Sequence, residues 1–326
     1  MNEARAGPDW VAVRRVALGV YFGVLVWSTF AIGVPIAHDR IFLFTFAGLA
    51  CACIGRTWRS AWHLLIDWVP FALVIIGYDY SRGWADSVGF GPYYSPQLDV
   101  DRMLFFGNVP TVWLQDHLYQ FALTRSGHYT ISGEPKLWEV MLAVVYVTHY
   151  LFSFILAGIL WAKERRRFQA FARRFVTLSY MGFVTYVVFP AAPPWLAAQH
   201  GDLPGFVGRY GRGFDRVGLH SIRDLIDKGA ATSNLTAAVP SLHFGFATLI
   251  AITLWDTWPR WSRPFLVVYP LLMGLSLVTT GEHYVSDLLL GGAYAFIAHI
   301  AWNHIEGWWQ ERGTPAAADR ELSQQF

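Results

Sequence analysis

The chain has 326 residues, of which 54% are hydrophobic and only 15% charged, whereas soluble globular proteins carry about 25% charged residues. Its mean hydropathy of +0.33 argues against a soluble domain and indicates a chain solvated largely by lipid. The net charge of +2 gives no reason to expect a nucleic-acid partner.

Eight apolar stretches are predicted to cross the membrane, since a span needs roughly 17–25 residues. In chain order they are residues 16–36, 41–55, 62–78, 137–161, 175–189, 240–255, 264–280 and 284–302. The second is short, and the third contains Asp67 and Pro70, so six or seven spans stay open as alternatives. Asp67 is expected to pair with His63, four residues earlier. The prediction is an all-α fold, a polytopic helical membrane bundle.

Basic residues set the orientation of this bundle. With eight spans, the arginines before the first span, after the second, between the fourth and fifth, and between the sixth and seventh all lie on one face. That face is then cytoplasmic, as are both termini. Residues 79–136 and 191–239 become two extracytoplasmic interfacial loops, with short helices expected at 111–123 and 221–228.

Three units are expected along the chain. Residues 1–136 hold the N-terminal transmembrane helices and the first extracytoplasmic loop, residues 137–310 hold the remaining spans, and residues 311–326 form a cytoplasmic tail. His149 stands alone on an apolar stretch and is expected to be a packing residue rather than part of a site.

The string GEHYVSD, residues 281–287, opens the eighth span. On a helix His283 and Asp287 share a face, because they are four residues apart. The carboxylate can hold one imidazole nitrogen and leave the other free to attack an electrophile. Taken alone, the pair is better explained as an ion pair at the level of the lipid headgroups.

The string VPSLHFG, residues 239–245, opens the sixth span. Pro240 suits the first helical position, which would place His243 in the first turn, where free N–H groups bind anions. Ser241 adds a hydroxyl. Alone, this string also fits an ordinary helix start. However, the sixth and eighth spans open on the same face, so a nucleophile, its orienting carboxylate, a proton donor and a phosphate cradle can converge there.

These residues resemble the type 2 phosphatidic acid phosphatase superfamily. Its Pro-Ser-Gly-His motif stands here as Pro240-Ser241-Leu242-His243. Its motif of Ser-Arg, five residues, His, three residues and Asp stands here as Ser276-Leu277, five residues, His283, three residues and Asp287. The motif arginine is replaced by Leu277, and the family's Lys and Arg-Pro motif is absent. With the sequence APPW at 192–195, these departures resemble the inositol phosphorylceramide synthase branch.

The resemblance implies a six-helix catalytic core in which His283 forms a phospho-histidine, Asp287 orients it, and His243 acts as acid and then base. It implies a lipid phosphate donor and a hydroxyl acceptor, and favours transfer over hydrolysis. A lipid or polyprenyl phosphate phosphatase and a non-catalytic lipid transporter or scaffold stay open. No metal, no cofactor and no obligatory protein partner are expected, and the compartment is expected to be the cell membrane.

A substitute is needed for the cation that would grip the phosphate. Arg82 at the end of the third span is the first candidate, with Asp79 and Tyr78 contacting the headgroup beside it. Arg209, Arg212 and Arg216 in the second loop are the next candidates, although they also suit contact with anionic lipid.

Overall fold

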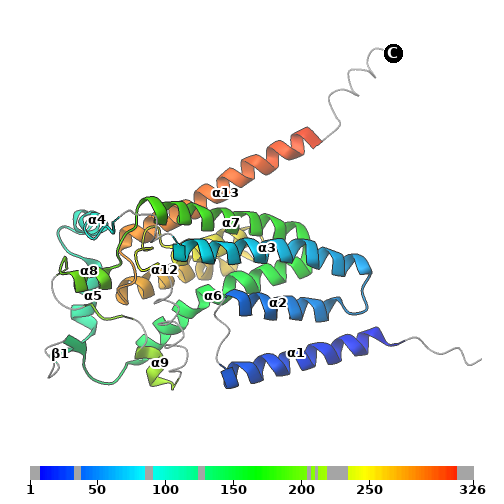
Figure 1. Cartoon of the computed structure of the whole chain (residues 1–326), viewed down its shortest axis with the longest axis horizontal. Helices are drawn as coiled ribbons and strands as arrows, with labels where there is room; N and C mark the ends of the chain where they lie inside the picture. The colour runs from blue at the N-terminus through cyan, green and yellow to red at the C-terminus, as the bar shows by residue number, and fades with distance from the viewer. Residues whose placement is uncertain are drawn as a thin grey trace, which may run out of the picture.

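The computed structural model describes residues 8–32, 38–84, 91–123, 129–203, 207–209, 212–218 and 234–313. Within these ranges, eight helices of 14 residues or more form the bundle (Figure 1). They are α1 (Trp10–Ile32), α2 (His38–Cys53), α3 (Trp58–Trp84), α6 (Leu137–Lys163), α7 (Arg165–Val188), α11 (Leu242–Trp255), α12 (Arg263–Thr279) and α13 (Val285–Gly313). Each corresponds to one predicted span, so the all-α membrane bundle is confirmed.

The helices differ in how well they suit a membrane by length and composition. Four are long and apolar enough to cross a membrane by themselves: α1, most of α3, residues Arg260–Thr279 and residues Val285–Arg312. A fifth, α6, passes as two halves bent by 47°. The helices α2 and α11 are shorter, with 16 and 14 residues, and α7 carries five arginines in its first ten residues. The protein is therefore a multi-pass membrane protein. Because α2, α7 and α11 are short or charged, packing against neighbouring helices has to stabilise them in the bundle.

Short elements gather at one end of the bundle, on the left in Figure 1. They are α4 (Pro96–Leu104), α5 (Pro110–Leu118), β1 (Phe121–Leu123), β2 (Tyr129–Ile131), α8 (Pro194–His200) and α9 (Arg212–Arg216). The helix expected at 111–123 is thus wrong in its last part, because the chain becomes extended at Tyr119 and residues 121–123 pair antiparallel with 129–131. The helix expected at 221–228 lies outside the described residues.

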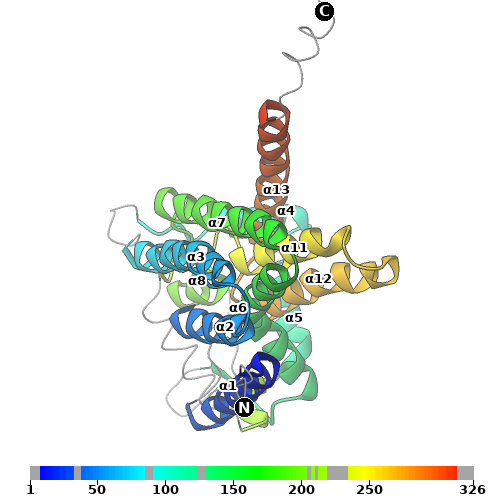
Figure 2. The same ribbon diagram turned by 90° about the vertical axis from the view of Figure 1, so that its right-hand side faces the viewer.

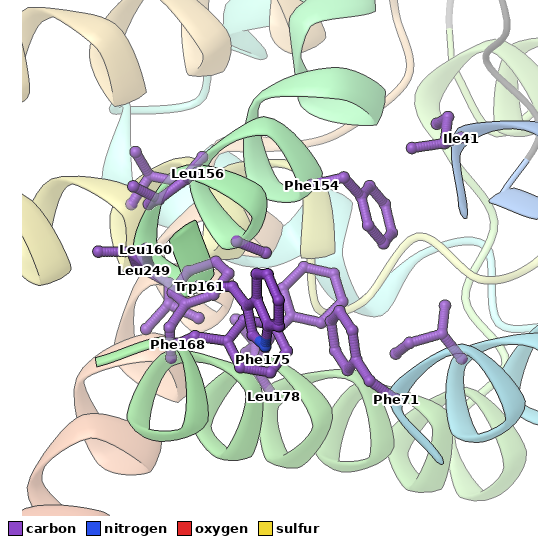
Figure 3. Close-up of a cluster of buried hydrophobic side chains, with 14 of the residues drawn as sticks. Ile41, Phe71, Phe154, Leu156, Leu160, Trp161, Phe168, Phe175, Leu178 and Leu249 are labelled. Carbon is purple, nitrogen blue, oxygen red and sulfur yellow. The ribbon is translucent and has the colours of Figure 1, made fainter. Parts of the chain in front are cut away.

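An aromatic cluster holds α2, α3, α6 and α7 together (Figure 3). Trp68 stacks on Phe168 with ring centroids 5.2 Å apart, and Phe71 meets Phe154, Phe168 and Phe175. Figure 2 shows α3 and α7 side by side, with α1 below the bundle. Aromatic pairs of this kind add about 0.5–1.5 kcal/mol each beyond the area they bury.

Asp67 faces this layer and is not paired with His63 as expected. Its carboxylate accepts hydrogen bonds from Arg165 Nη2 at 2.8 Å, Trp161 Nε1 at 2.9 Å and Gln169 Nε2 at 3.1 Å. These donors come from α6 and α7, so tertiary packing replaces the local i,i+4 pair. The charge in the third span is therefore neutralised inside the protein.

The helices α11 and α13 approach each other unusually closely near their N-terminal ends. A Cβ atom at Gly291 would lie 2.1 Å from the carbonyl oxygen of Ser241. Ser241 N–H donates to the Asp287 carbonyl oxygen at 3.0 Å, which joins the two helix starts directly. This contact fixes the relative position of the two predicted motifs.

Candidate active site

The eighth-span motif folds as a turn followed by the start of α13. Gly281 has a φ of +69°, a conformation that favours glycine, and it lies in the turn that connects α12 to His283. His283 is 4% exposed and Asp287 is fully buried. Asp287 Oδ2 accepts from the Tyr284 backbone N–H at 2.9 Å and from His283 Nδ1 at 3.3 Å. The carboxylate therefore closes the first helical turn and also orients the imidazole.

The sixth-span motif lies directly against this turn. Ser241 is the N-cap of α11 and its Oγ accepts from the Phe244 N–H at 3.4 Å, so the helix begins at Leu242. Pro240 was expected at the first helical position and instead precedes the cap, because the Ser241 side chain takes the capping role. His243 does lie in the first turn, as predicted. Its Nδ1 is 3.2 Å from His283 Nε2.

The Asp287 carboxylate fixes how protons are arranged on His283 and His243. A carboxylate only accepts, so His283 Nδ1 carries the proton that faces Asp287. With this tautomer a neutral His283 presents a lone pair at Nε2, which can accept a proton from Nδ1 of His243, 3.2 Å away. The nitrogen expected to attack thus points at the expected proton donor.

Two residues of α6 complete the surroundings of His243. The ring of His149 lies 4.0 Å from the His243 ring at 75°, and the Tyr146 ring lies 5.5 Å away. His149 Nδ1 donates to the Tyr146 carbonyl at 2.5 Å. His149 therefore packs against His243, a contact that the sequence does not signal because nothing local to α6 points to this distant partner, and the expectation of a packing role stays a prediction.

A small cavity of about 10 Å³, roughly the space of one water molecule, lies beside Tyr146. Its polar lining includes Tyr119, Glu139, Arg209 and Arg212. Burial, together with the nearby Glu139 carboxylate, raises the pKa of Tyr119, so its phenol stays neutral. Neither motif histidine lines this cavity, and Tyr146 is the lining residue whose ring lies 5.5 Å from the His243 ring.

The predicted phosphate-binding residues are spread over two regions. Arg212 donates to Glu139 Oε2 at 3.2 Å and to the carbonyls of Ile131 and Gly133, while Arg216 donates to the Pro135 carbonyl. Tyr78 is buried and packs edge-on against Tyr180, with ring centroids 6.0 Å apart. The Arg82 side chain lies outside the described residues. The roles predicted for these residues, for Asp79 and for Ser241 stay predictions.

Arg209 forms an ion pair with the residue that precedes the motif histidine. Its Nε is 3.2 Å from Glu282 Oε1, and Glu282 immediately precedes His283. Its guanidinium carbon lies 4.1 Å from the Trp195 ring centroid. Leu277, at the position of the motif arginine, is fully buried among apolar side chains.

Gln115 fixes the loop that carries Arg209. Its side chain is 1% exposed, donates to the carbonyls of Gly208 and Thr279, and accepts from the Gly208 N–H, each at 2.8 Å. In the described part of the chain, no cluster of three or more His, Cys, Asp or Glu side chains suits a metal ion. The expectation of metal-independent chemistry stays a prediction.

The fold and site define a polytopic helical membrane protein with a histidine pair and a carboxylate at one end of its bundle. A family model described as the PAP2 superfamily matches residues 112–301, more than half of the chain. The chain belongs to the PAP2 superfamily, as the motifs predicted.

Three relatives are between 27% and 32% identical to this chain over the residues that align. The phosphoinositol dihydroceramide synthase of Bacteroides thetaiotaomicron is 32% identical over 145 residues, which is 42% of this chain and 46% of that protein. The inositol phosphorylceramide synthase of Candida albicans is 29% identical over 151 residues, 45% of this chain and 32% of that protein. The catalytic subunit AUR1 of the Saccharomyces cerevisiae inositol phosphorylceramide synthase is 27% identical over 136 residues, 39% and 33% of the two chains.

The matches to these curated relatives cover less than half of their length. No solved structure matches the chain.

Proposed function

We propose that the protein is a membrane lipid phosphotransferase that moves a phospho-headgroup from a lipid donor to a hydroxyl acceptor. The observation that carries this proposal is the line of Asp287, His283 and His243, joined at 3.3 Å and 3.2 Å. A held imidazole with a free lone pair beside a second imidazole suits nucleophilic and acid–base catalysis at phosphorus.

In the proposed first step, the donor phosphate enters between the two imidazoles and His283 Nε2 attacks phosphorus. The bond from phosphorus to the leaving lipid oxygen breaks, and His243 protonates that oxygen. In the second step His243 takes the proton of the acceptor hydroxyl, the acceptor oxygen attacks phosphorus, and the phosphorus–nitrogen bond breaks. The His283 imidazole is restored, so no atom is left over.

The names of the relatives suggest the substrates. They include phosphoinositol dihydroceramide synthase and inositol phosphorylceramide synthase. We therefore propose an inositol phospholipid as donor and a ceramide-type lipid as acceptor. With arginines grouped on the opposite face, the site lies on the extracytoplasmic side of the cell membrane and both termini are cytoplasmic.

Arg209 is the proposed cation for the transferred phosphate. It lines the cavity beside Tyr146 and contacts the residue before His283. Its contacts with Glu282 and Trp195 hold the guanidinium in place before a substrate arrives. Arg212, bonded to Glu139 and to two carbonyls, is proposed to support the cavity wall.

The test uses the full chain in lipid nanodiscs with a phosphatidylinositol donor labelled in the headgroup and a ceramide acceptor. We expect labelled inositol phosphorylceramide from the wild type, and a loss of several orders of magnitude in the His283→Ala variant. His304→Ala, at an exposed histidine of α13, the helix that begins two residues after His283, is the control. Release of the headgroup to water alone would indicate a phosphatase instead, and equal turnover of His283→Ala and wild type would reject the nucleophile.

A further inference from the structure

A second carboxylate reaches the start of α13 from a distant part of the chain. Asp101 lies in α4 and is fully buried, although 184 residues separate it from Val285. Its Oδ2 accepts from the Val285 backbone N–H at 3.0 Å, and its Oδ1 accepts from the Ser286 N–H at 2.9 Å. Both oxygens of Asp101 are therefore directed at the first turn of α13.

This turn is the one that carries the proposed catalytic pair. The first N–H groups of a helix have no partner within the helix and leave a partial positive charge there. Asp287 takes the Tyr284 N–H, and Asp101 takes the next two. Two carboxylates, one local and one from α4, together close the turn between His283 and Asp287.

Neighbouring contacts keep α4 in place. Gln97, which is 3% exposed, donates to the Ala192 carbonyl at 2.7 Å, and Ser286 Oγ donates to the Gln97 carbonyl at 3.3 Å. Leu98 packs in one buried cluster with Trp195 and Tyr284. Burial raises the pKa of Asp101, while its bonds from Ser286 and Val285 oppose that rise and favour the carboxylate.

We propose that Asp101 is a positioning residue for the transfer reaction. It holds the backbone of residues 284–286, so that Asp287 keeps its direction towards His283 Nδ1 and His283 keeps Nε2 directed at the phosphorus. Asp101 lies outside residues 112–301, the part of the chain that the family model matches. The inference rests on the proposed function for its readout, but the carboxylate contacts stand independently of it.

The test compares Asp101→Asn and Asp101→Ala with a control on the same helix. Asp99 has a side chain that is 65% exposed and lies 3.5 Å from Arg102, so Asp99→Asn and Asp99→Ala are matched changes away from α13. Each variant is assayed as the full chain in nanodiscs with the labelled donor and acceptor. The melting temperature and the fraction of folded protein are measured on the same samples.

We expect kcat per folded molecule to fall about 10–100-fold in Asp101→Asn, since small displacements of reacting groups reduce rates on that scale. KM for the donor is expected to stay within about twofold, because Asp101 does not touch substrate in this proposal. Asp101→Ala is expected to lose more, and both Asp99 variants to match the wild type.

Two results would overturn the inference: wild-type kcat per folded molecule in Asp101→Asn, or a loss that only follows the loss of folded protein. Asp101→Asn keeps the size of the side chain, so it supplies the answer where Asp101→Ala fails to fold. An inactive wild type would instead reject the proposed function.

Discussion

The Nδ1 atom of His243 lies 3.2 Å from the Nε2 atom of His283, although 40 residues and the whole of α12 separate them. This distance is shorter than the space that a phosphoryl group needs. In the proposed reaction the phosphate therefore has to separate the two rings, and the contact between the starts of α11 and α13 holds the segments that carry them.

Gly291→Ala is expected to disturb this crossing. The new Cβ would meet the Ser241 carbonyl oxygen at 2.1 Å, which is backbone and cannot turn aside. We expect a drop in kcat of at least about tenfold, because the two histidines lose their relative orientation. Gly307→Ala in the same helix has nothing within 4 Å and serves as control. Equal kinetics of the two variants would contradict the close approach.

The rate of transfer is expected to depend on pH through the two imidazoles. His283 has to be neutral to attack, so the rate rises with pH at first, and His243 has to be protonated to release the leaving group, so the rate then falls. His243→Asn is expected to lose about 10²–10⁴-fold in rate and also the falling limb. A flat wild-type profile from about pH 5 to about pH 9 would speak against these roles.

Arg209→Gln is expected to raise KM for the donor and to lower kcat, together reducing kcat/KM by about 10²-fold or more, because a cation on the phosphate is lost. Arg209→Lys retains the charge and should lose less. Arg212→Gln serves for comparison, since its bonds to Glu139, Ile131 and Gly133 predict a lower melting temperature rather than a raised KM. The reverse pattern would exchange the roles proposed for Arg209 and Arg212.

His149→Phe is expected to change catalysis through His243 rather than through stability. The substitution keeps a ring beside His243, where His149 now lies 4.0 Å away, but removes a second titratable group. We expect the falling limb of the pH–rate profile to move while the melting temperature stays near that of the wild type. An unchanged profile would return His149 to a packing role.

Arg174 and Arg173 offer a matched pair far from the site. Both contact Glu306, but the Arg174 side chain is 6% exposed and the Arg173 side chain 33% exposed. Glu306 keeps Arg173 as a partner when Arg174 is removed, but Arg174→Ala also removes the hydrogen bonds of this buried side chain to Asn303 and to the Ala170 carbonyl, so it is expected to lower the free energy of unfolding by about 1.5–3 kcal/mol. Arg173→Ala should cost about 1 kcal/mol or less. Denaturant unfolding in detergent micelles measures both, and comparable losses would refute the distinction.

The sequence predicted what depends on local pattern and on the order of the spans. The eight helices were predicted from apolar stretches. The contact between His243 and His283 was predicted because the sixth and eighth spans begin on the same face of the membrane. The pairing of Asp67 with Arg165 and the contact of His149 with His243 depend on which helices pack together, which a single sequence does not encode locally. The strand at 121–123 was missed because it and its partner at 129–131 have only three residues each, too few to show a strand periodicity.

The contact of Asp101 with α13 also affects how much of the chain an active fragment needs. The stretch shared with the superfamily starts at residue 112, whereas Asp101, the acceptor for two of the first amides of α13, lies before it in the chain. A version shortened to that border would remove the carboxylate that accepts from these amides, two and three residues after His283. The positioning role proposed for Asp101 therefore predicts that the smallest active fragment has to retain α4.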